Sequence, residues 1–213
     1  MIVLRTKGVQ FDVTYINLQE KPNWFLKISP HGKVPVLNVE EQPLFESNAI
    51  AEFLDEVVEP HLHPADPIKR ARNRAWTDFV PEFSKGLSAA YRRKTVEQTQ
   101  AGKQDAEKVL RKLEDAITTE RENDGPYFNG NRLSLVDAAY APFFHRFMIA
   151  EAKLNTGLLI QFPHVKAWVD ALLATELVTG SVAENFVSEF KISMKRYGYY
   201  IGDLFEMEAV AAE

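Results

Sequence analysis

The fold of this chain is decided by one stretch of its sequence, Lys33-Val-Pro-Val-Leu-Asn-Val-Glu-Glu-Gln-Pro-Leu-Phe-Glu-Ser47. Apolar, mostly β-branched residues from Val34 to Val39 predict a short strand, and Leu44-Phe45 predicts a second one. The residues between them, Glu40 to Pro43, are typical of a turn. Two short strands on either side of a tight turn indicate a β-hairpin.

The Val34–Pro35 bond allows two interpretations. A cis peptide there would turn the preceding backbone N–H and C=O outward, free to pair with an extended peptide ligand. The alternative is a trans proline on an edge strand, where the lost ladder hydrogen bond is tolerated. The spacing alone favours trans, because only about 5–6% of X-Pro bonds in folded proteins are cis.

Glu46 and Ser47 lie where the second strand gives way to a helix. The helix is predicted from one apolar face, formed by Ile50, Phe53, Leu54, Val57 and Val58. A helix N-terminus offers free N–H groups and a partial positive charge, which suit a ligand carboxylate. The serine hydroxyl adds a donor, and the glutamate can accept from an ammonium group, so the zwitterionic end of a peptide would satisfy both. The alternative is a simple helix cap.

Lys21 precedes a short helix, which Pro22 is suited to open. The ammonium group of this lysine is a point charge that could bind a second carboxylate of a ligand. The alternative is a lysine that is simply solvated at the surface.

Outward from the deciding stretch, the sequence divides at a proline-rich segment. Pro60 ends the helix, and the chain from Val58 to Pro67 contains three prolines, which marks a linker. Upstream, residues 1–7 read as the end of a helix, and alternating apolar residues over 9–15 predict a further strand. We therefore expect an α+β domain over 1–58, a linker over 59–67 and an all-helical domain over 68–213.

The second domain carries helical patterns throughout. Ser134 and Asp137 have the spacing at which each side chain can satisfy a free backbone N–H at a helix start. The apolar run over 138–150 predicts a buried central helix. Further apolar faces are predicted by Ala71, Ala75, Phe79 and Phe83, by Ala106, Val109, Leu110, Leu113 and Ile117, and by Val165, Trp168, Val169 and Leu172.

Composition narrows the functional classes. Of the 213 residues, 46% are hydrophobic and 26% charged, as in soluble globular proteins, and a net charge of -5 argues against a nucleic-acid partner. No apolar run approaches the roughly 18 residues of a membrane helix, and Arg5 and Lys7 interrupt any N-terminal signal sequence. The absence of cysteine excludes disulfides, thiolate metal sites and a cysteine nucleophile from these residues. We expect a cytoplasmic protein without a metal or a membrane partner, and interpret His61 and His63 as linker residues.

Four motifs occur in an order that resembles the glutathione transferase superfamily, closest to its omega-like and related bacterial classes. They are Lys21-Pro-Asn-Trp-Phe25, Ser29-Pro-His-Gly-Lys-Val-Pro-Val-Leu37, Phe45-Glu-Ser-Asn-Ala-Ile50 and Asn129-Gly-Asn-Arg-Leu-Ser-Leu-Val-Asp137. Each motif is short, but together the motifs extend the likeness over nearly the whole chain. The resemblance implies a thioredoxin-like N-terminal domain followed by an all-helical domain, the glutathione transferase fold.

The resemblance also implies roles for single residues, with glutathione as the cosubstrate and no metal. The backbone of Val34 would pair with the cysteinyl unit of glutathione, with Pro35 in cis. Glu46 and Ser47 would hold the γ-glutamyl end. Lys21 would meet the glycine carboxylate.

The catalytic residue is left unassigned. The superfamily's first strand and the start of its first helix have no counterpart in this sequence, and residues 1–8 resemble only the second half of that helix. Those parts carry the cysteine, serine or tyrosine that acts on the glutathione sulfur, so we expect that residue upstream of Met1. Without this central strand, two sheet edges would be unpaired.

Two functions are compatible with the resemblance. The first is a detoxifying transferase that conjugates glutathione to a small electrophile, or performs glutathione-dependent thiol transfer or reduction on a disulfide. The second is a non-catalytic binding or regulatory protein, because the sequence also resembles stringent starvation protein A, a transcription-associated relative. The superfamily implies a homodimer, with the N-terminal half of one subunit against the helical domain of the other.

Overall fold

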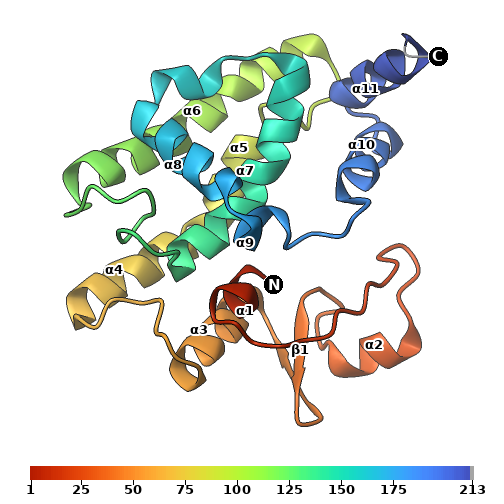
Figure 1. Cartoon of the computed structure of the whole chain (residues 1–213). Coiled ribbons are helices and arrows are strands. Elements are labelled where there is room, and N and C mark those ends of the chain that lie inside the picture. The colour runs from red at the N-terminus through yellow and green to blue at the C-terminus, as the bar shows by residue number, and fades with distance from the viewer. Residues whose placement is uncertain (212–213) are drawn as a thin grey trace.

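The chain folds into a small N-terminal unit beneath a larger set of helices (Figure 1). The computed structural model describes residues 1–211. The N-terminal unit contains α1 (Ile2–Thr6), α2 (Asn23–Ile28), β1 (Val36–Val39), β2 (Gln42–Phe45) and α3 (Ser47–Val57). The helical half contains α4 (Pro67–Asp78), α5 (Val80–Ser88), α6 (Val96–Thr119), α7 (Leu135–Leu154), η1 (Leu158–Gln161, a 3-10 turn), α8 (Pro163–Ala174), α9 (Glu176–Thr179), α10 (Phe186–Arg196) and α11 (Tyr200–Ala211). Among these described helices, none combines the length and the apolar character needed to cross a membrane.

The predicted hairpin is confirmed, with β1 and β2 antiparallel and Val36 opposite Phe45 at the open end. The turn is shorter than the predicted Glu40–Pro43 segment, because β2 already begins at Gln42. The two glutamates between the strands have positive φ angles of 48° and 66°. Two-residue hairpin turns use positive φ because it matches the twist of the strands, and they usually carry asparagine and glycine. Two glutamates are not the residue types that specify such a two-residue turn, although the sequence predicts a turn over the longer segment.

The strand predicted over residues 9–15 is absent, and this segment has no regular secondary structure. The sheet in the described part of the chain has two strands, β1 and β2, which pair with each other. A strand needs a neighbour for its backbone N–H and C=O groups, and this segment has none among the described residues. Val9 and Phe11 pack against the core of the N-terminal unit, whereas Val13 and Tyr15 are exposed.

The apolar face predicted over residues 71–83 is only half right. Phe83 is fully buried, whereas Ala71 and Ala75 are exposed. Asn73 and Thr77 face inward from α4 instead. Alanine is found both inside proteins and at their surfaces, so its spacing says little when short polar residues alternate with it.

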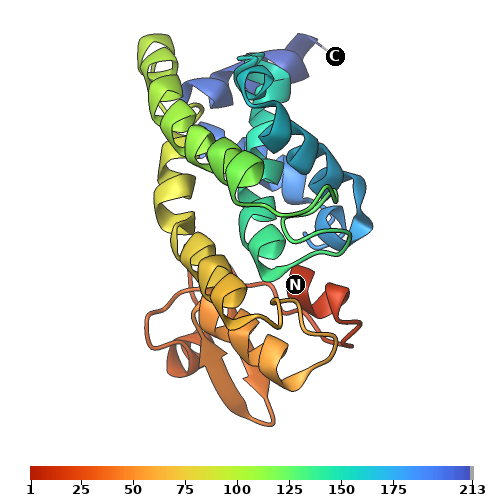
Figure 2. The same cartoon turned by 90° about the vertical axis from the view of Figure 1, so that its left-hand side faces the viewer.

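The predicted central helix is confirmed as α7, whose aromatic residues form the middle of the core of the helical half. The Tyr140 ring lies 4.7 Å from the Phe83 ring and 5.5 Å from the Trp168 ring, measured between centroids. The Tyr140 hydroxyl donates to the Trp76 carbonyl at 2.8 Å, which ties α7 to α4. Figure 2 shows α4 and α5 rising in line from the N-terminal unit along one side of the helical half.

Asp137 forms the predicted capping box with Ser134 at the start of α7. The carboxylate accepts hydrogen bonds from the Ser134 N–H at 2.7 Å and from the Ser134 hydroxyl at 2.6 Å. It also accepts from the Phe128 N–H at 2.9 Å and from the Trp168 indole at 2.6 Å. One buried side chain therefore joins α7, α8 and the loop that precedes them, which confirms its interpretation as a folding device.

Candidate functional site

The open end of the hairpin brings together four of the residues singled out in the sequence. Val36 and Phe45 form the last paired position of the two strands. The residues just before Val36 are Val34 and Pro35, and those just after Phe45 are Glu46 and Ser47. Because the strands are antiparallel, both dipeptides leave the sheet at the same end.

Val34 lies in an ordered loop that leaves its own backbone groups free. The Val34–Pro35 peptide bond is cis, which confirms the conformation implied by the family resemblance. The hydroxyl of Ser29 donates to the Lys33 carbonyl at 2.9 Å and accepts from the Lys33 N–H at 3.0 Å, so the loop is closed just before Val34. Within residues 1–211, neither backbone group of Val34 makes a hydrogen bond. They are available to a ligand of extended backbone shape.

Glu46 and Ser47 form the junction of β2 and α3. Glu46 is the N-cap residue, with a positive φ of 67°, and its side chain makes no capping hydrogen bond. The first helical hydrogen bond runs from the Ile50 N–H to the Glu46 carbonyl. In the described structure, the N–H groups of Ser47 and the next two residues have no acceptor. These free donors and the helix dipole give α3 a positive end at the surface, and the simple-cap alternative is not supported.

Lys21 lies against the loop before β1, and His31, in that loop, lies beside the junction of β2 and α3. The ammonium nitrogen of Lys21 is 3.9 Å from the position that a Cβ atom on Gly32 would take, in the same loop as Val34. The His31 Nε2 atom lies 4.0 Å from a carboxylate oxygen of Glu46, and its ring lies 5.5 Å from the Phe45 ring, measured between centroids. His31 lies at the surface, and nothing in its local sequence pattern pairs it with Glu46.

The cluster is an open surface feature. The side chains of His31 and Glu46 are more than half exposed. A hollow of about 390 Å³ lies on the helical half, and its lining residues include Arg93 and Asp105. Another hollow, of about 200 Å³, lies between the linker and the loop before α7, beside His63. Neither hollow includes Val34, Glu46 or Ser47. A ligand at the open end of the hairpin would therefore lie on an open surface and be held chiefly by polar contacts.

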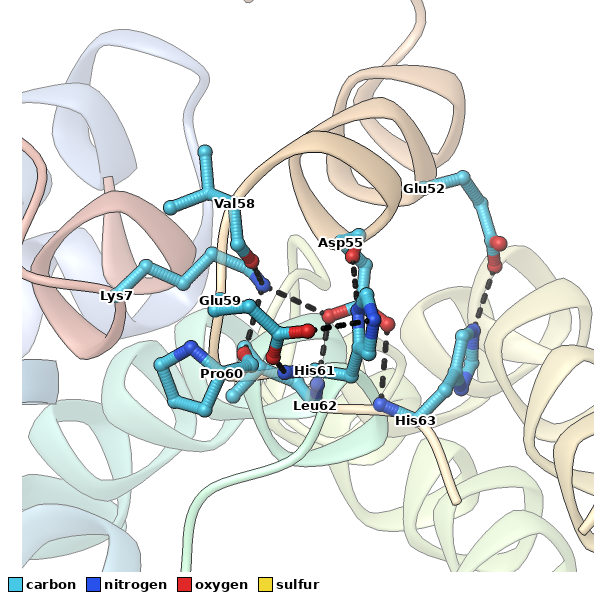
Figure 3. Close-up of polar contacts among 9 residues, drawn as sticks. All are labelled: Lys7, Glu52, Asp55, Val58, Glu59, Pro60, His61, Leu62 and His63. Atoms are coloured by element: carbon cyan, nitrogen blue, oxygen red, sulfur yellow. Dashed lines mark hydrogen bonds and ion pairs between the residues drawn. The ribbon is translucent and has the colours of Figure 1, made fainter. Parts of the chain in front are cut away.

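The position of α3 is fixed by a buried ion pair at its C-terminal end (Figure 3). The Lys7 ammonium group donates to the Val58 carbonyl at 2.6 Å and to the Pro60 carbonyl at 2.9 Å, and lies 2.9 Å from the Asp55 carboxylate. Asp55 in turn accepts from the backbone N–H of Leu62 at 2.6 Å. Burial acts to raise the pKa of Asp55, but hydrogen bonds from Leu62 and Lys7 outweigh it and hold the pKa below its usual value.

A second polar contact links α3 to α4 through the linker. The carboxylate of Glu52 accepts from the His63 Nε2 atom at 2.7 Å and from the Arg74 guanidinium at 2.6 Å (Figure 3 shows the histidine contact). Burial favours a higher pKa for Glu52, and the hydrogen bonds from Arg74 and His63 reverse this to a lowered pKa. His63, in the segment between α3 and α4, therefore contacts the same carboxylate of α3 as Arg74 of α4. In the described part of the chain, no group of three or more histidine or carboxylate side chains is arranged to hold a metal ion.

Comparison with known proteins places both halves of the chain in one family. Residues 1–57 match the model of the glutathione S-transferase N-terminal domain, and residues 95–171 match the model of the glutathione S-transferase C-terminal domain. The chain is 34% identical to glutathione S-transferase U19 of Arabidopsis thaliana, over 89% of this chain and 88% of the relative. It is 32% identical to glutathione S-transferase omega-1 of Rattus norvegicus, over 88% of this chain and 78% of the relative.

A solved structure shares the fold. Rice GST1 (OsGSTU1), crystallised in complex with glutathione, superposes with a TM-score of 0.76 at 26% sequence identity. The match covers 92% of this chain and 90% of the rice protein. The likeness therefore extends across the N-terminal unit, the linker and the helical half.

Proposed function

The chain belongs to the glutathione S-transferase family, and on this premise we propose that it binds glutathione at the open end of the β1–β2 hairpin. The observation that carries the proposal is that the unsatisfied N-terminus of α3 lies next to the exposed carboxylate of Glu46, which makes no capping hydrogen bond and, among the described residues, has only a long contact of 4.0 Å with His31. Glutathione carries an α-amino acid group at one end, a cysteinyl unit in the middle and a carboxylate at the other end. Each part has a matching group in the cluster.

The γ-glutamyl end is the part that the start of α3 would hold. Its carboxylate would accept from the free N–H and the hydroxyl of Ser47, where the helix dipole favours an anion. Its ammonium group would donate to the Glu46 carboxylate, which no described side chain saturates. A charge pair of this kind selects for an amino acid over a simple carboxylate.

The rest of the tripeptide would follow the loop before β1. The backbone N–H and C=O of Val34, with Pro35 in cis, would pair with the cysteinyl unit as an added strand does. Lys21, which lies beside the same loop, would meet the glycine carboxylate. This arrangement fixes the direction of the tripeptide and so the place of its sulfur.

The chain is a glutathione-dependent transferase by its family membership. The thiol of glutathione loses its proton, and the sulfur lone pair forms a bond to an electrophilic carbon as the leaving group departs. In thiol transfer, the same thiolate attacks a disulfide sulfur and expels the other half as a thiolate. The 213 residues contain no cysteine, so none of their side chains can supply the attacking sulfur in either reaction. The residue that activates this thiol is not assigned.

Calorimetric titration with glutathione tests the proposed site. We expect Glu46→Gln to weaken binding by about tenfold, because the hydrogen bond from the ligand ammonium loses its charged acceptor. Glu41→Gln is the matched control, since Glu41 is also an exposed glutamate with a positive φ but lies at the far end of the hairpin. Folded protein that does not bind glutathione, or equal losses in the two variants, would show that the site is wrong.

A conjugation assay with an aromatic chloride, run on the same samples, separates binding from turnover. If Glu46→Gln lowers both the conjugation rate and the affinity for glutathione, the result supports a transferase that uses this site. Glutathione binding without turnover of either an electrophile or a disulfide would favour the alternative of a non-catalytic binding protein.

We also propose that the protein is a cytoplasmic homodimer that acts in detoxification. The family resemblance implies a contact between the N-terminal half of one subunit and the helical domain of the other. Phe45 (39% exposed) beside the hairpin and Ile68 (66% exposed) on α4 are apolar side chains on the two halves that such a contact would cover. Sedimentation equilibrium should give a dimer, and Ile68→Glu should shift it toward monomer. A monomer in the unchanged protein would contradict the proposed assembly.

A further inference from the structure

The hollow of about 200 Å³ beside His63 lies between the linker and the loop before α7, away from the hairpin cluster. Residues 61–64 line one side of it, and residues 129 and 132–134 line the other. No acidic side chain is among the described residues that line it. Since a water molecule takes up about 30 Å³ in the liquid, the hollow has room for a small polyatomic ion.

Both walls of the hollow are held in place by buried aspartates. On the linker side, Asp55 accepts from the backbone N–H groups of Leu62 and His63, at 2.6 and 3.1 Å. On the other side, Asp137 accepts from the backbone N–H groups that flank the loop over residues 129–133, at 2.9 and 2.7 Å. Because both backbones are fixed, the polar groups that line the hollow are positioned before a ligand binds.

His63 contributes a buried polar atom that has no partner. Its side chain is only 4% exposed. The Nε2 atom lies 2.7 Å from the Glu52 carboxylate, and Figure 3 shows the other ring nitrogen turned away from this contact. That nitrogen, Nδ1, is shielded from solvent and makes no hydrogen bond in the described part of the chain. Because an unpaired buried polar atom is costly, its position beside a hollow points to a ligand as its partner.

The contact with Glu52 determines whether Nδ1 of His63 donates or accepts. A carboxylate has no hydrogen to give, so the hydrogen in this contact lies on Nε2. A neutral imidazole with its hydrogen on Nε2 has a lone pair on Nδ1. Nδ1 is therefore an acceptor, and it pairs with a ligand that carries an O–H or N–H group.

The opposite wall of the hollow supplies donors and a positive charge. Asn129 and Arg132 are exposed, and their side chains make no hydrogen bond or ion pair within residues 1–211. The backbone N–H groups of Arg132 and Leu133 also lack a described acceptor. His61 differs, because its Nδ1 atom lies 2.6 Å from the Asp55 carbonyl and its Nε2 atom 3.0 Å from a neighbouring carboxylate. The wall formed by residues 129–133 thus favours an anion.

We propose that this hollow binds hydrogen phosphate, an ion that combines charged oxygens with an O–H group. The charged oxygens would accept from Arg132 and Asn129, and the O–H group would donate to Nδ1 of His63. Sulfate has the same tetrahedral shape but no O–H group at neutral pH, so it would leave Nδ1 unpaired. The bound ion would join the linker to the loop before α7. This site does not require the proposed glutathione site, and either can be tested without the other.

Calorimetric titration with sodium phosphate and with sodium sulfate, at equal ionic strength, tests the site. The titrations are run at about pH 8, where histidine side chains are ordinarily neutral. We expect phosphate to bind about tenfold more tightly than sulfate, because only phosphate satisfies the buried acceptor. Equal affinities for the two ions, or no binding of phosphate, would overturn the proposal.

Arg132→Gln locates the bound ion. It should weaken phosphate binding by about tenfold, because the ion loses its charged donor. Arg196→Gln is the matched control, since Arg196 is an exposed arginine on α10, which does not line the hollow. The control should leave the affinity for phosphate unchanged. Equal affinities for phosphate in the two variants would refute the site.

His63→Gln tests the selectivity for phosphate. The glutamine amide can still donate to Glu52, but the acceptor at Nδ1 is removed. We expect the affinity for phosphate to fall to that for sulfate, in protein shown by circular dichroism to be folded. A folded variant that still prefers phosphate tenfold would contradict the role of Nδ1. The comparison of the two ions in the unchanged protein does not depend on this buried substitution.

An excess of glutathione separates this proposal from the hairpin site, because the start of α3 also offers free N–H groups to an anion. The affinity for phosphate should be the same with and without glutathione. Displacement of phosphate by glutathione would place the ion at the hairpin and would overturn the proposed site at His63 and Arg132.

Discussion

Asp137 shows how one buried residue fixes the position of several elements. Its side chain is fully buried and accepts hydrogen bonds from the backbone of Phe128, the backbone and hydroxyl of Ser134, and the indole of Trp168. The serine and the aspartate were visible in the sequence as a helix start. The bonds to Phe128 and Trp168 join segments that are remote from the cap, and no local pattern indicates them.

Replacing Asp137 tests how much stability this residue supplies. Asp137→Ala should lower the free energy of unfolding by about 3–5 kcal/mol, because several buried donors lose their acceptor at once. The matched control is Asp170→Ala on α8, whose carboxylate is exposed and pairs with Lys166, and it should change stability by less than about 1 kcal/mol. Urea unfolding measures both. Similar losses in the two variants would contradict the role assigned to Asp137.

The residues of the hairpin cluster illustrate what short motifs can and cannot predict. The Val34–Pro35 and Glu46–Ser47 pairs were found because strand ends and helix starts have local signatures. His31 was not connected with Glu46, because the two residues are brought together by the loop before β1 and not by their spacing. The predicted roles in ligand binding depend on the experiments described above.

At the scale of elements, the contact between α6 and the end of α5 depends on the absence of a side chain. A Cβ atom on Gly102 of α6 would lie 1.9 Å from the Ala89 carbonyl oxygen, far inside van der Waals contact. The neighbouring Ala101 points to solvent. In the sequence, Gly102 is only a weak point in a helical pattern, and the reason for it is visible in the packing.

Gly102→Ala should therefore change the free energy of unfolding in the direction opposite to that expected from helix propensity. Propensity alone would stabilise α6 by about 1 kcal/mol. The close approach to Ala89 should instead lower the free energy of unfolding by about 2 kcal/mol, because the two helices must move apart. Ala101→Gly, which probes propensity without the contact, should cost about 1 kcal/mol. A Gly102→Ala protein that is more stable than the original would disprove the packing argument.

The failure of the strand predicted over residues 9–15 also belongs to the element scale. Alternation predicts that a segment has one apolar side, and Val9 and Phe11 do pack inward. It does not supply the neighbouring strand that a ladder of hydrogen bonds requires. Whether residues 9–15 form a strand thus depends on a neighbouring strand as much as on their own sequence.

At the scale of the whole molecule, Lys7 and Asp55 tie α1, α3 and the linker together. Both side chains are almost entirely removed from solvent, with exposed fractions of 0% and 7%. α1 also packs on α7 and α9 of the helical half, so the ion pair lies at the junction of the two parts of the chain. Breaking a buried pair leaves the remaining charge without compensation, which is costly.

The lowered pKa of Asp55 predicts a pH dependence of stability. A carboxyl group whose pKa is lower in the folded than in the unfolded state contributes stability above its unfolded pKa of about 3.9 and loses it as the pH falls through the folded value. Asp55→Asn should therefore reduce stability at pH 7 by about 3 kcal/mol. It should also flatten the decline of stability below about pH 4.

Urea unfolding as a function of pH measures both effects. Asp78→Asn is the control, because Asp78 is an exposed aspartate at the end of α4. This variant should leave the stability at pH 7 and the loss of stability in acid unchanged. An acid decline of unchanged steepness in Asp55→Asn would show that Asp55 is not its source.

The sequence by itself determined the elements whose signals are local. The hairpin, the helix that begins after Glu46, the capping box at Ser134 and the buried central helix follow from turns, caps and periodicity, which a few neighbouring residues specify. The order of the motifs was enough to identify the family. Such features can be predicted from neighbouring residues, because each element must first be compatible with its own backbone geometry.

Only the tertiary structure decided which distant groups meet. The inward face of α4 and the buried pair of Lys7 and Asp55 both depend on contacts between elements far apart in the chain. The periodicity of apolar residues predicts which apolar side chains are buried. It cannot predict a buried polar residue or the partner that compensates its charge. The physical reason is that burying a polar group is favourable only in a particular three-dimensional arrangement of donors, acceptors and charges.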